Sequence, residues 1–303
     1  MHLPVLYHEI IHALQPQPGG YYVDGTLGAG GHAWGILDAS SPDGKLLGMD
    51  LDPTALMDAE QHLAQFGSRV ILKRASYVTL RRELATLGWK AVQGIVLDLG
   101  VSSMQLDTPE RGFSFRTDSP LDMRFDPQAK TTAADLVNSL SEADLADLIY
   151  HFGEERRSRQ VARAIVKVRP IHTTRQLAEV VAKATSGGRS RIHPATRTFQ
   201  ALRIAVNREL DAIEQVLPEA VAALAPSGRL AVISFHSLED RIVKQFIRRA
   251  SRDCVCPPKQ PVCTCEHKAS LTDITRKPIQ PSETEALKNP RARSSRLRIA
   301  EKL

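Results

Sequence analysis

Glycine and aspartate residues in the first hundred positions have the types and spacing expected of a nucleotide-binding site. Residues 24–32 read Asp-Gly-Thr-Leu-Gly-Ala-Gly-Gly-His, so that Gly28, Gly30 and Gly31 stand close together. Glycine lets the backbone approach a ligand closely and supplies positive φ where a turn needs it. Asp50 follows Gly30 by twenty residues, a spacing at which a carboxylate can bind ribose hydroxyls. The pattern predicts an adenosine-containing ligand, with a tight structural turn as the alternative.

Two classes of ligand fit this loop. Gly28, Gly30 and Ala33 match the dinucleotide-binding fingerprint, with alanine as its third small residue. Asp24, however, stands directly before the first glycine, at the end of an expected strand. Its carboxylate would repel a pyrophosphate but attract the ammonium group of a methionine moiety. Asp24 therefore favours S-adenosylmethionine over a nicotinamide dinucleotide.

Short apolar runs place these acids at the ends of strands. Four runs are rich in β-formers, and each precedes a turn and a helix-like stretch: 21–25, 45–50, 69–73 and 94–98. Strands that alternate with helices in this way form parallel βαβ units, and ligands bind at the carboxyl ends of such strands. Asp24, Asp50 and Asp98 lie at three of these ends. We expect an α/β fold with the three acids beside the ligand.

The pattern changes after Asp98. A stretch rich in Gly, Pro and Ser is followed by residues with helical periodicity, and an apolar run at 229–235 then resumes the sheet. We therefore expect a helical module of roughly 90 residues, a normal domain size, inserted into the α/β domain. Ser237, with Asp240 three positions on, is expected to cap the helix that follows.

Two helices are predicted inside or beside this insert. The first, 154–168, has Val161, Ile165 and Val168 on one face and a row of cations on the opposite face. The second, 196–217, has a single apolar stripe, which predicts a continuous spine between subdomains.

Composition and charge narrow the class of protein. The chain has 303 residues, of which 42% are hydrophobic and 24% charged, as in average soluble proteins. No apolar run reaches the roughly 18 residues of a membrane span, and Glu9 interrupts the N-terminal segment before the apolar core of a signal peptide could form. We therefore expect a cytoplasmic protein without a membrane partner. The net charge is +6, and residues 156–208 contain 13 basic residues and 1 acid. Such a block predicts a polyanion-binding surface, with solvated helix faces as the alternative.

Four cysteines lie within twelve residues near the C-terminus. Cys254, Cys256, Cys263 and Cys265 form two C-x-C pairs. Clustering in a cytosolic chain disfavours disulfides and suggests a zinc knuckle, although C-x-x-C is the commoner spacing. Free thiols remain the alternative. Because all the cysteines are in the tail, none is placed for attack on carbon 5 of a pyrimidine ring.

Several long motifs occur in the same order as in one known family. The motifs are Asp24-Gly25-Thr26 with Gly28 to His32, Asp98 to Ser103, Arg111 to Phe115, His193 to Gln200, Ser234 to Arg241 and Asn289 to Ser294. From about His8 to Glu301 the chain resembles the bacterial small-subunit (16S) ribosomal RNA cytosine-N4 methyltransferases. These enzymes use S-adenosylmethionine to methylate a cytidine at the decoding site.

The resemblance implies a fold, a set of cofactor contacts and a partner. The fold is a class I methyltransferase Rossmann-like sheet, formed by residues 1–105 and 210–303, with 106–209 as an inserted all-helical domain that recognises the substrate. The partner is 16S ribosomal RNA within the small ribosomal subunit. The cofactor contacts that match by motif are Gly30, Gly31, His32, Asp50, Tyr77, Asp98 and Gln105.

The acceptor would be an exocyclic amine, which is a poor nucleophile because its lone pair is delocalised into the ring. The site must therefore orient this nitrogen and accept its hydrogen bonds. Asp98 is placed for part of this task, with a structural or cofactor-only role as the alternative. Other amino-methyltransferase families have Asp-Pro-Pro-Tyr at this point, where this chain has Asp98-Leu-Gly-Val. Ser102, Ser103 and His236 are further candidates to bond the base, although His236 could instead cap backbone groups.

RNA binding is assigned to aromatic and basic residues outside the cofactor loop. Phe113 and Phe115 are candidates to stack on a flipped base. The candidate phosphate contacts are Arg156, Arg159, Arg163, Lys167, Arg197, Arg291 and Arg293. Two rival functions remain: a nicotinamide dehydrogenase, which leaves the basic insert without a role, and a non-catalytic RNA-binding assembly factor, which leaves Asp24 and Asp50 without one.

Overall fold

The chain forms two compact units. The computed structural model describes residues 4–185, 193–257, 260 and 262–303. The first unit comprises Met1–Gly100 and Leu210–Leu303, and the second comprises Val101–Glu209. The division follows Gly100, five residues before the boundary expected from the sequence.

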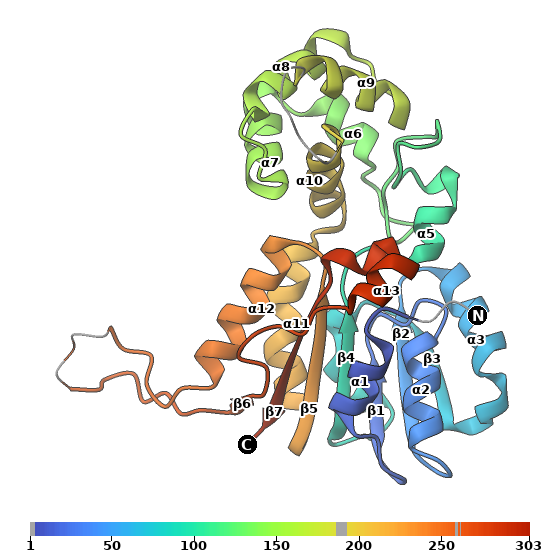
Figure 1. Ribbon diagram of the computed structural model, residues 1–303, viewed down its shortest axis with the longest axis vertical. Helices are drawn as coiled ribbons and strands as arrows, with labels where there is room; N and C mark the ends of the chain where they lie inside the picture. The colour runs from blue at the N-terminus through green and yellow to red at the C-terminus, as the bar shows by residue number, and fades with distance from the viewer. Residues whose placement is uncertain (1–3, 186–192, 258–259, 261) are drawn as a thin grey trace. The chain divides into compact units, whose positions relative to one another are not determined.

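A seven-stranded sheet runs through the first unit, with the strand order β3-β2-β1-β4-β5-β7-β6 (Figure 1). The first five strands are parallel, and β7 is antiparallel to both β5 and β6. The strands are β1 (Tyr21–Asp24), β2 (Lys45–Asp50), β3 (Val70–Arg74), β4 (Val92–Asp98), β5 (Leu224–Ser234), β6 (Leu271–Asp273) and β7 (Arg296–Lys302). The predicted α/β class is confirmed, and the short β6 was not foreseen.

Helices cover both faces of this sheet, because buried side chains alternate along the strands. Tyr22 of β1 packs in the cluster that contains residues of α1 and α2, whereas its neighbour Val23 packs with residues of α11 and α12. The helices of this unit are α1 (Tyr7–Leu14), α2 (Gly31–Ala39), α3 (Pro53–Leu63), α4 (Leu80–Thr86), α11 (Glu209–Ala223), α12 (Ser237–Ala250) and α13 (Glu283–Lys288). Short 3-10 helices span Ala64–Arg69, Tyr77–Thr79 and Pro290–Ser294.

The second unit is helical, as the sequence predicts, and has its own core. Ile149, Ile165 and Leu202, from three different helices, are fully buried in one cluster. Its helices are α5 (Ser103–Asp107), the 3-10 turn Pro109–Arg111, α6 (Ala133–Ser139), α7 (Glu142–Gly153), α8 (Ser158–Val168), α9 (Thr174–Ala184) and α10 (Thr196–Asn207).

Three predictions about helices were wrong. The helix expected at 154–168 begins at Ser158, because Glu154 ends α7 in the left-handed conformation, and Val168 is exposed. The spine expected at 196–217 is two helices, α10 and α11, separated by Arg208 with φ of 50°. A left-handed residue breaks a helix but leaves the apolar periodicity on either side intact. The cap of α12 is His236 instead of Ser237.

Across the described ranges, no helix is long and apolar enough to cross a bilayer.

Candidate active site

Three neighbouring parallel strands of the first unit end in the predicted acids. β1 pairs with β2 on one side and with β4 on the other, so Asp24, Asp50 and Asp98 lie at the same edge of the sheet. Asp24 is close enough to the other two carboxylates for their charges to act on it. β1 lies where the strand order reverses, which is where ligands bind in open α/β sheets.

The loop after β1 ties these strand ends together. The backbone amide of Gly28 donates to Oδ2 of Asp50 at 2.9 Å. The hydroxyl of Thr26 accepts from the backbone amide of Asp98 at 2.6 Å, while its own amide donates to Oδ1 of Asp24 at 3.1 Å. The glycine loop therefore holds each of the three acids at a defined position. The hydrogen bonds of Thr26 to Asp24 and Asp98 were not indicated by any sequence pattern.

Two positions in this loop require glycine. Gly30, with φ of 80°, precedes the first residue of α2, and a Cβ there would lie 3.0 Å from a methyl group of Leu63. A Cβ on Gly31 would lie 2.6 Å from Cγ of Pro4. A larger residue at either position would therefore collide with Leu63 or Pro4. At position 30 its backbone would also be strained, because φ is positive there.

His32 is buried at this edge without a hydrogen bond. Its side chain is 5% exposed, its ring stacks on Tyr7 with 6.4 Å between centroids, and its Nε2 lies 3.7 Å from Oδ2 of Asp98. Within the described residues, neither ring nitrogen of His32 has a hydrogen-bond partner, and neither does the buried Oδ1 of Asp98. Buried polar atoms normally have partners, so these atoms indicate a site that a polar ligand completes.

Two acids of the site, Asp24 and Asp50, have raised pKa values. Burial raises the pKa of Asp24 from 3.8 to about 6, although the nearby His32 and the Thr26 amide lower it, and the charges of Asp98 and Asp50 raise it further. Burial likewise raises the pKa of Asp50, against the backbone amides that donate to it. A carboxylate that is costly to ionise in isolation is suited to pair with a cationic group brought by a ligand.

Tyr77 and His236 are two further predicted residues of the first unit. Tyr77 starts the 3-10 helix after β3, and a Cβ placed on Gly25 would lie 3.1 Å from its Cβ, so Tyr77 borders the loop. His236 caps α12: its Nδ1 accepts from the amide of Glu239 at 3.4 Å, and its Nε2 lies 3.1 Å from Oε1 of the same residue. Capping, the alternative considered for His236, is thus observed, and its catalytic role stays a prediction.

The predicted residues of the second unit have local roles. Ser102 caps α5 in a reciprocal pair with Gln105, in which each side chain accepts from the other's backbone amide at 3.2 Å. Ser103 is the exposed first residue of that helix.

The two aromatic residues predicted to stack on RNA pack inside the second unit. Phe113 is 9% exposed and stacks on Phe125, while the half-buried Phe115 packs against His193 and Phe199. Phe113 is thus largely buried, and stacking on RNA stays a prediction for both residues.

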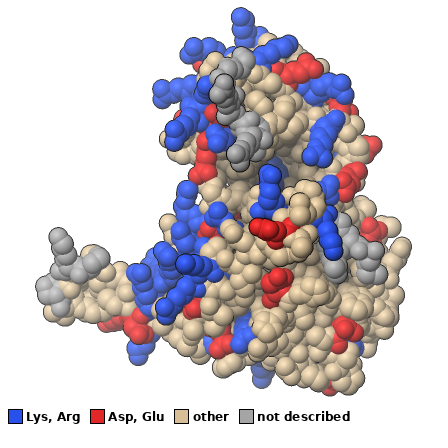
Figure 2. All heavy atoms as spheres, viewed as in Figure 1, with Lys and Arg blue, Asp and Glu red and all other residues tan. Residues whose placement is uncertain are grey.

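The predicted phosphate contacts are exposed on both units, and Figure 2 shows Lys and Arg side chains gathered on each. On α8 the buried Val161 and Ile165 face the core while the cations face solvent. Arg163 lies 3.3 Å from Glu142 and Arg197 lies 3.5 Å from Glu155. Residues 186–192 of the basic block lie outside the described residues. Further exposed cations lie on and after α12, in the basic C-terminal part of the chain, and were not among the predicted contacts: Arg241, Arg248, Arg249 and Arg252.

Comparison with known proteins places the chain in a family. The family model described as the MraW methylase family matches residues 1–303. The chain is 54% identical to ribosomal RNA small subunit methyltransferase H of Syntrophotalea carbinolica, over 100% of this chain and 98% of that protein. It is 52% identical to the protein of the same name from Geobacter sulfurreducens, over 100% and 99%. With a family model matching from end to end and relatives of this similarity, the chain belongs to the MraW methylase family.

Proposed function

We propose that this protein transfers the methyl group of S-adenosylmethionine to the exocyclic N4 of a cytidine at the decoding site of 16S ribosomal RNA. The observation that carries the proposal is the edge formed by Asp24, His32 and Asp98 beside a glycine loop. There, buried polar atoms of His32 and Asp98 have no hydrogen-bond partner in the part of the chain that the structure describes. The names of the relatives, ribosomal RNA small subunit methyltransferase H, support the choice of substrate.

The residues of this edge fit S-adenosylmethionine. Asp24, buried and held by the loop, would pair with the ammonium group of the methionine moiety, and Asp50 would bind the ribose hydroxyls. The backbone of Gly30 and Gly31 leaves room for close approach, and Tyr77 would pack on the adenosine. Gln105 is expected to complete the contacts. The bound cofactor would supply an electrophilic methyl group on its sulfonium sulfur.

Asp98 would orient the acceptor amine. Its buried Oδ1 has no hydrogen-bond partner among the described residues, so it can accept a hydrogen bond from N4, which helps to direct the nitrogen lone pair out of conjugation with the ring. When a methyl group replaces a hydrogen on N4, one proton is released, and the Asp98 carboxylate is the base placed to receive it. His32, 3.7 Å away, would hold this carboxylate in position. Ser102, Ser103 and His236 remain candidates to bond other atoms of the base.

The substrate RNA would be bound by the exposed cations. Arg156, Arg159 and Lys167 are exposed on or beside α8, and Arg291 and Arg293 are exposed in the 3-10 helix before β7. Each such cation that neutralises a phosphate releases counterions and adds to affinity without reading sequence. We propose that the enzyme acts in the cytoplasm on the small ribosomal subunit.

The proposal is tested by incubating the purified protein with methyl-labelled S-adenosylmethionine and unmodified small subunits, followed by mass spectrometry of the nucleosides. We expect N4-methylcytidine, with a rate reduced about 100-fold or more for Asp98→Asn and unchanged for Asp38→Asn, an exposed acid on α2. Label at carbon 5, or equal rates for the two variants, would refute the assigned chemistry. Tight cofactor binding without labelled RNA would favour the non-catalytic assembly factor.

A further inference from the structure

The two C-x-C pairs of the sequence converge in a projecting loop, here called the cysteine arm and defined as the described residues between α12 and β6, which are 251–257, 260 and 262–270. The arm follows α12 and returns to the edge strand β6 (Figure 1). Its base is closed by the amide of Ser270, which donates to the carbonyl of Ala250 at 2.8 Å, and by the amide of Ala269, which donates to Asp253 at 3.2 Å. The active-site strands β1, β2 and β4 lie on the other side of β5 and β7 in the sheet.

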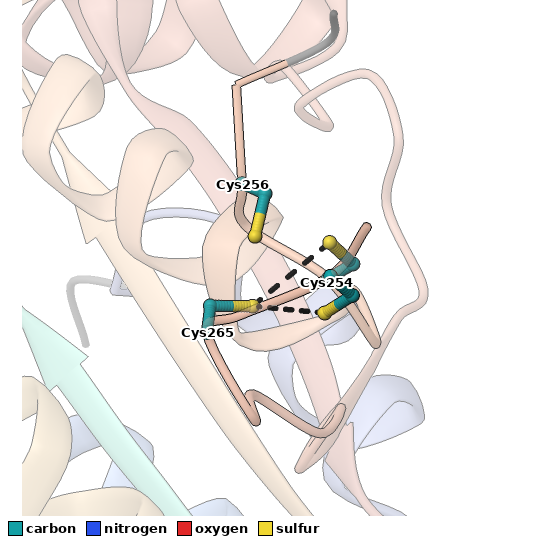
Figure 3. Close-up of side chains that lie close together, drawn as sticks. Cys254, Cys256 and Cys265 are labelled. Carbon is teal, nitrogen blue, oxygen red and sulfur yellow. Dashed lines mark hydrogen bonds between the residues drawn. The ribbon is translucent and has the colours of Figure 1, made fainter. Parts of the chain in front are cut away.

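The four sulfur atoms lie at the separations of a metal site. All four are within 4.8 Å of one another. Sγ of Cys265 lies 3.6 Å from that of Cys263 and 3.9 Å from that of Cys254. Figure 3 shows how closely Cys254, Cys256 and Cys265 approach one another. In a tetrahedral site with Zn–S bonds of about 2.3 Å, neighbouring sulfurs are about 3.8 Å apart. The cluster therefore surrounds a space that a Zn²⁺ ion would fill with little movement of the chain.

Backbone amides point at these sulfurs, as they do toward thiolates. The amide of Val255 donates to Sγ of Cys265 at 3.4 Å, and the amide of Thr264 donates to Sγ of Cys256 at 3.5 Å. Each C-x-C pair thus stabilises a thiolate of the other pair, and closely spaced thiolates without a cation would repel one another.

The arm also needs a substitute for a hydrophobic core. None of its described residues is buried, and Val262 is 70% exposed. A segment of this size without a core is normally held by disulfides or a metal. A disulfide requires about 2.05 Å between sulfurs, and all four cysteines are free.

We propose that Cys254, Cys256, Cys263 and Cys265 form a closed structural Zn²⁺ site that orders the cysteine arm. Four thiolate ligands leave no open coordination position, so the site would stabilise the arm without taking part in methyl transfer. This assignment is independent of the proposed function.

The experiment is metal analysis of the full-length protein, purified from zinc-supplemented cells and desalted under reducing conditions. We expect about one equivalent of zinc, released together with four titratable thiols by an organomercurial reagent. Cobalt loaded in place of zinc should show thiolate charge-transfer bands and intense tetrahedral d–d absorption. Cys254→Ser and Cys265→Ser should each weaken zinc binding by more than about tenfold. Val262→Ser, which also introduces a serine on the same arm but at an exposed position without a sulfur, should leave zinc binding unchanged.

A second measurement separates loss of the metal from loss of the fold. Because the arm lies beyond the β6 edge, affinity for S-adenosylmethionine should change less than about twofold in both cysteine variants. The proposal is overturned by negligible zinc after reconstitution with excess Zn²⁺, by a disulfide in the reconstituted protein, or by stoichiometric iron in place of zinc. Equal zinc content in the Cys265→Ser variant and the wild type would also overturn it.

Discussion

Asp24→Asn is predicted to stabilise the protein while weakening cofactor binding. Burial raises the pKa of Asp24 from 3.8 to about 6, so between about pH 4 and pH 6 the folded protein keeps a proton that the unfolded chain has lost. The free energy of unfolding therefore falls as pH rises through this interval. A shift of about two units corresponds to at most about 3 kcal/mol. Asparagine is neutral and its Oδ1 can still accept from the Thr26 amide, so the variant avoids this loss.

Urea unfolding of the cofactor-free protein at about pH 3.5 and about pH 8, which bracket this interval, measures the effect. The variant should match the wild type at the lower pH and exceed it by about 1–3 kcal/mol at the higher pH. Asp240→Asn is the control with the opposite sign. Burial raises the pKa of Asp240, but Arg298 at 2.7 Å and Arg296 hold it below its usual value, so this variant should lose stability at pH 8.

Cofactor titration completes the test. In the wild type, affinity for S-adenosylmethionine should rise as pH increases through about 6, because Asp24 must ionise to pair with an ammonium group. In Asp24→Asn that rise should disappear. A variant that is destabilised equally at both pH values, or that keeps the wild-type pH dependence of binding, would refute the role assigned to Asp24.

The glycine loop and the basic helix give two further predictions. Gly28→Ala, at φ of 51° with open space around the added Cβ, should lose about 1–2 kcal/mol in urea unfolding. Gly30→Ala should lose more and should also weaken calorimetrically measured cofactor binding, since its Cβ meets a leucine methyl group at 3.0 Å; equal losses would contradict the steric argument. Replacing Arg159 and Arg163 with alanine should lower the slope of log affinity for RNA against log salt by about one to two, leaving cofactor affinity unchanged, and an unaltered slope would remove α8 from the RNA surface.

Much of the catalytic edge could be predicted because its signals are local. A short β-rich run followed by a turn determines that a strand ends near its last acid, so Asp24, Asp50 and Asp98 could be placed from the sequence alone. Glycine at position 30 similarly reports a positive φ before the structure is known. The resemblance to a known family then added cofactor contacts such as Tyr77. Neither the residue type of Tyr77 nor its position in the sequence would by itself indicate a binding role.

Other features depended on contacts between distant segments. The apolar stripe over 196–217 persists across the left-handed Arg208, so periodicity alone could not reveal the break between α10 and α11. The burial of Phe113 and the capping by His236 depend on which neighbours pack or bond there, and residue type does not specify those neighbours.

The sequence by itself determined the α/β class, the acids at the strand ends, the glycine loop and the basic character of α8, because each follows from the conformational preference or charge of consecutive residues. Only the tertiary structure decided which polar atoms meet. It brings His32 within 3.7 Å of Asp98 and gathers four sulfurs from two separate C-x-C pairs. These contacts join residues that are separated along the chain. Their geometry is therefore determined by packing and electrostatics, and not by the conformational preferences of consecutive residues.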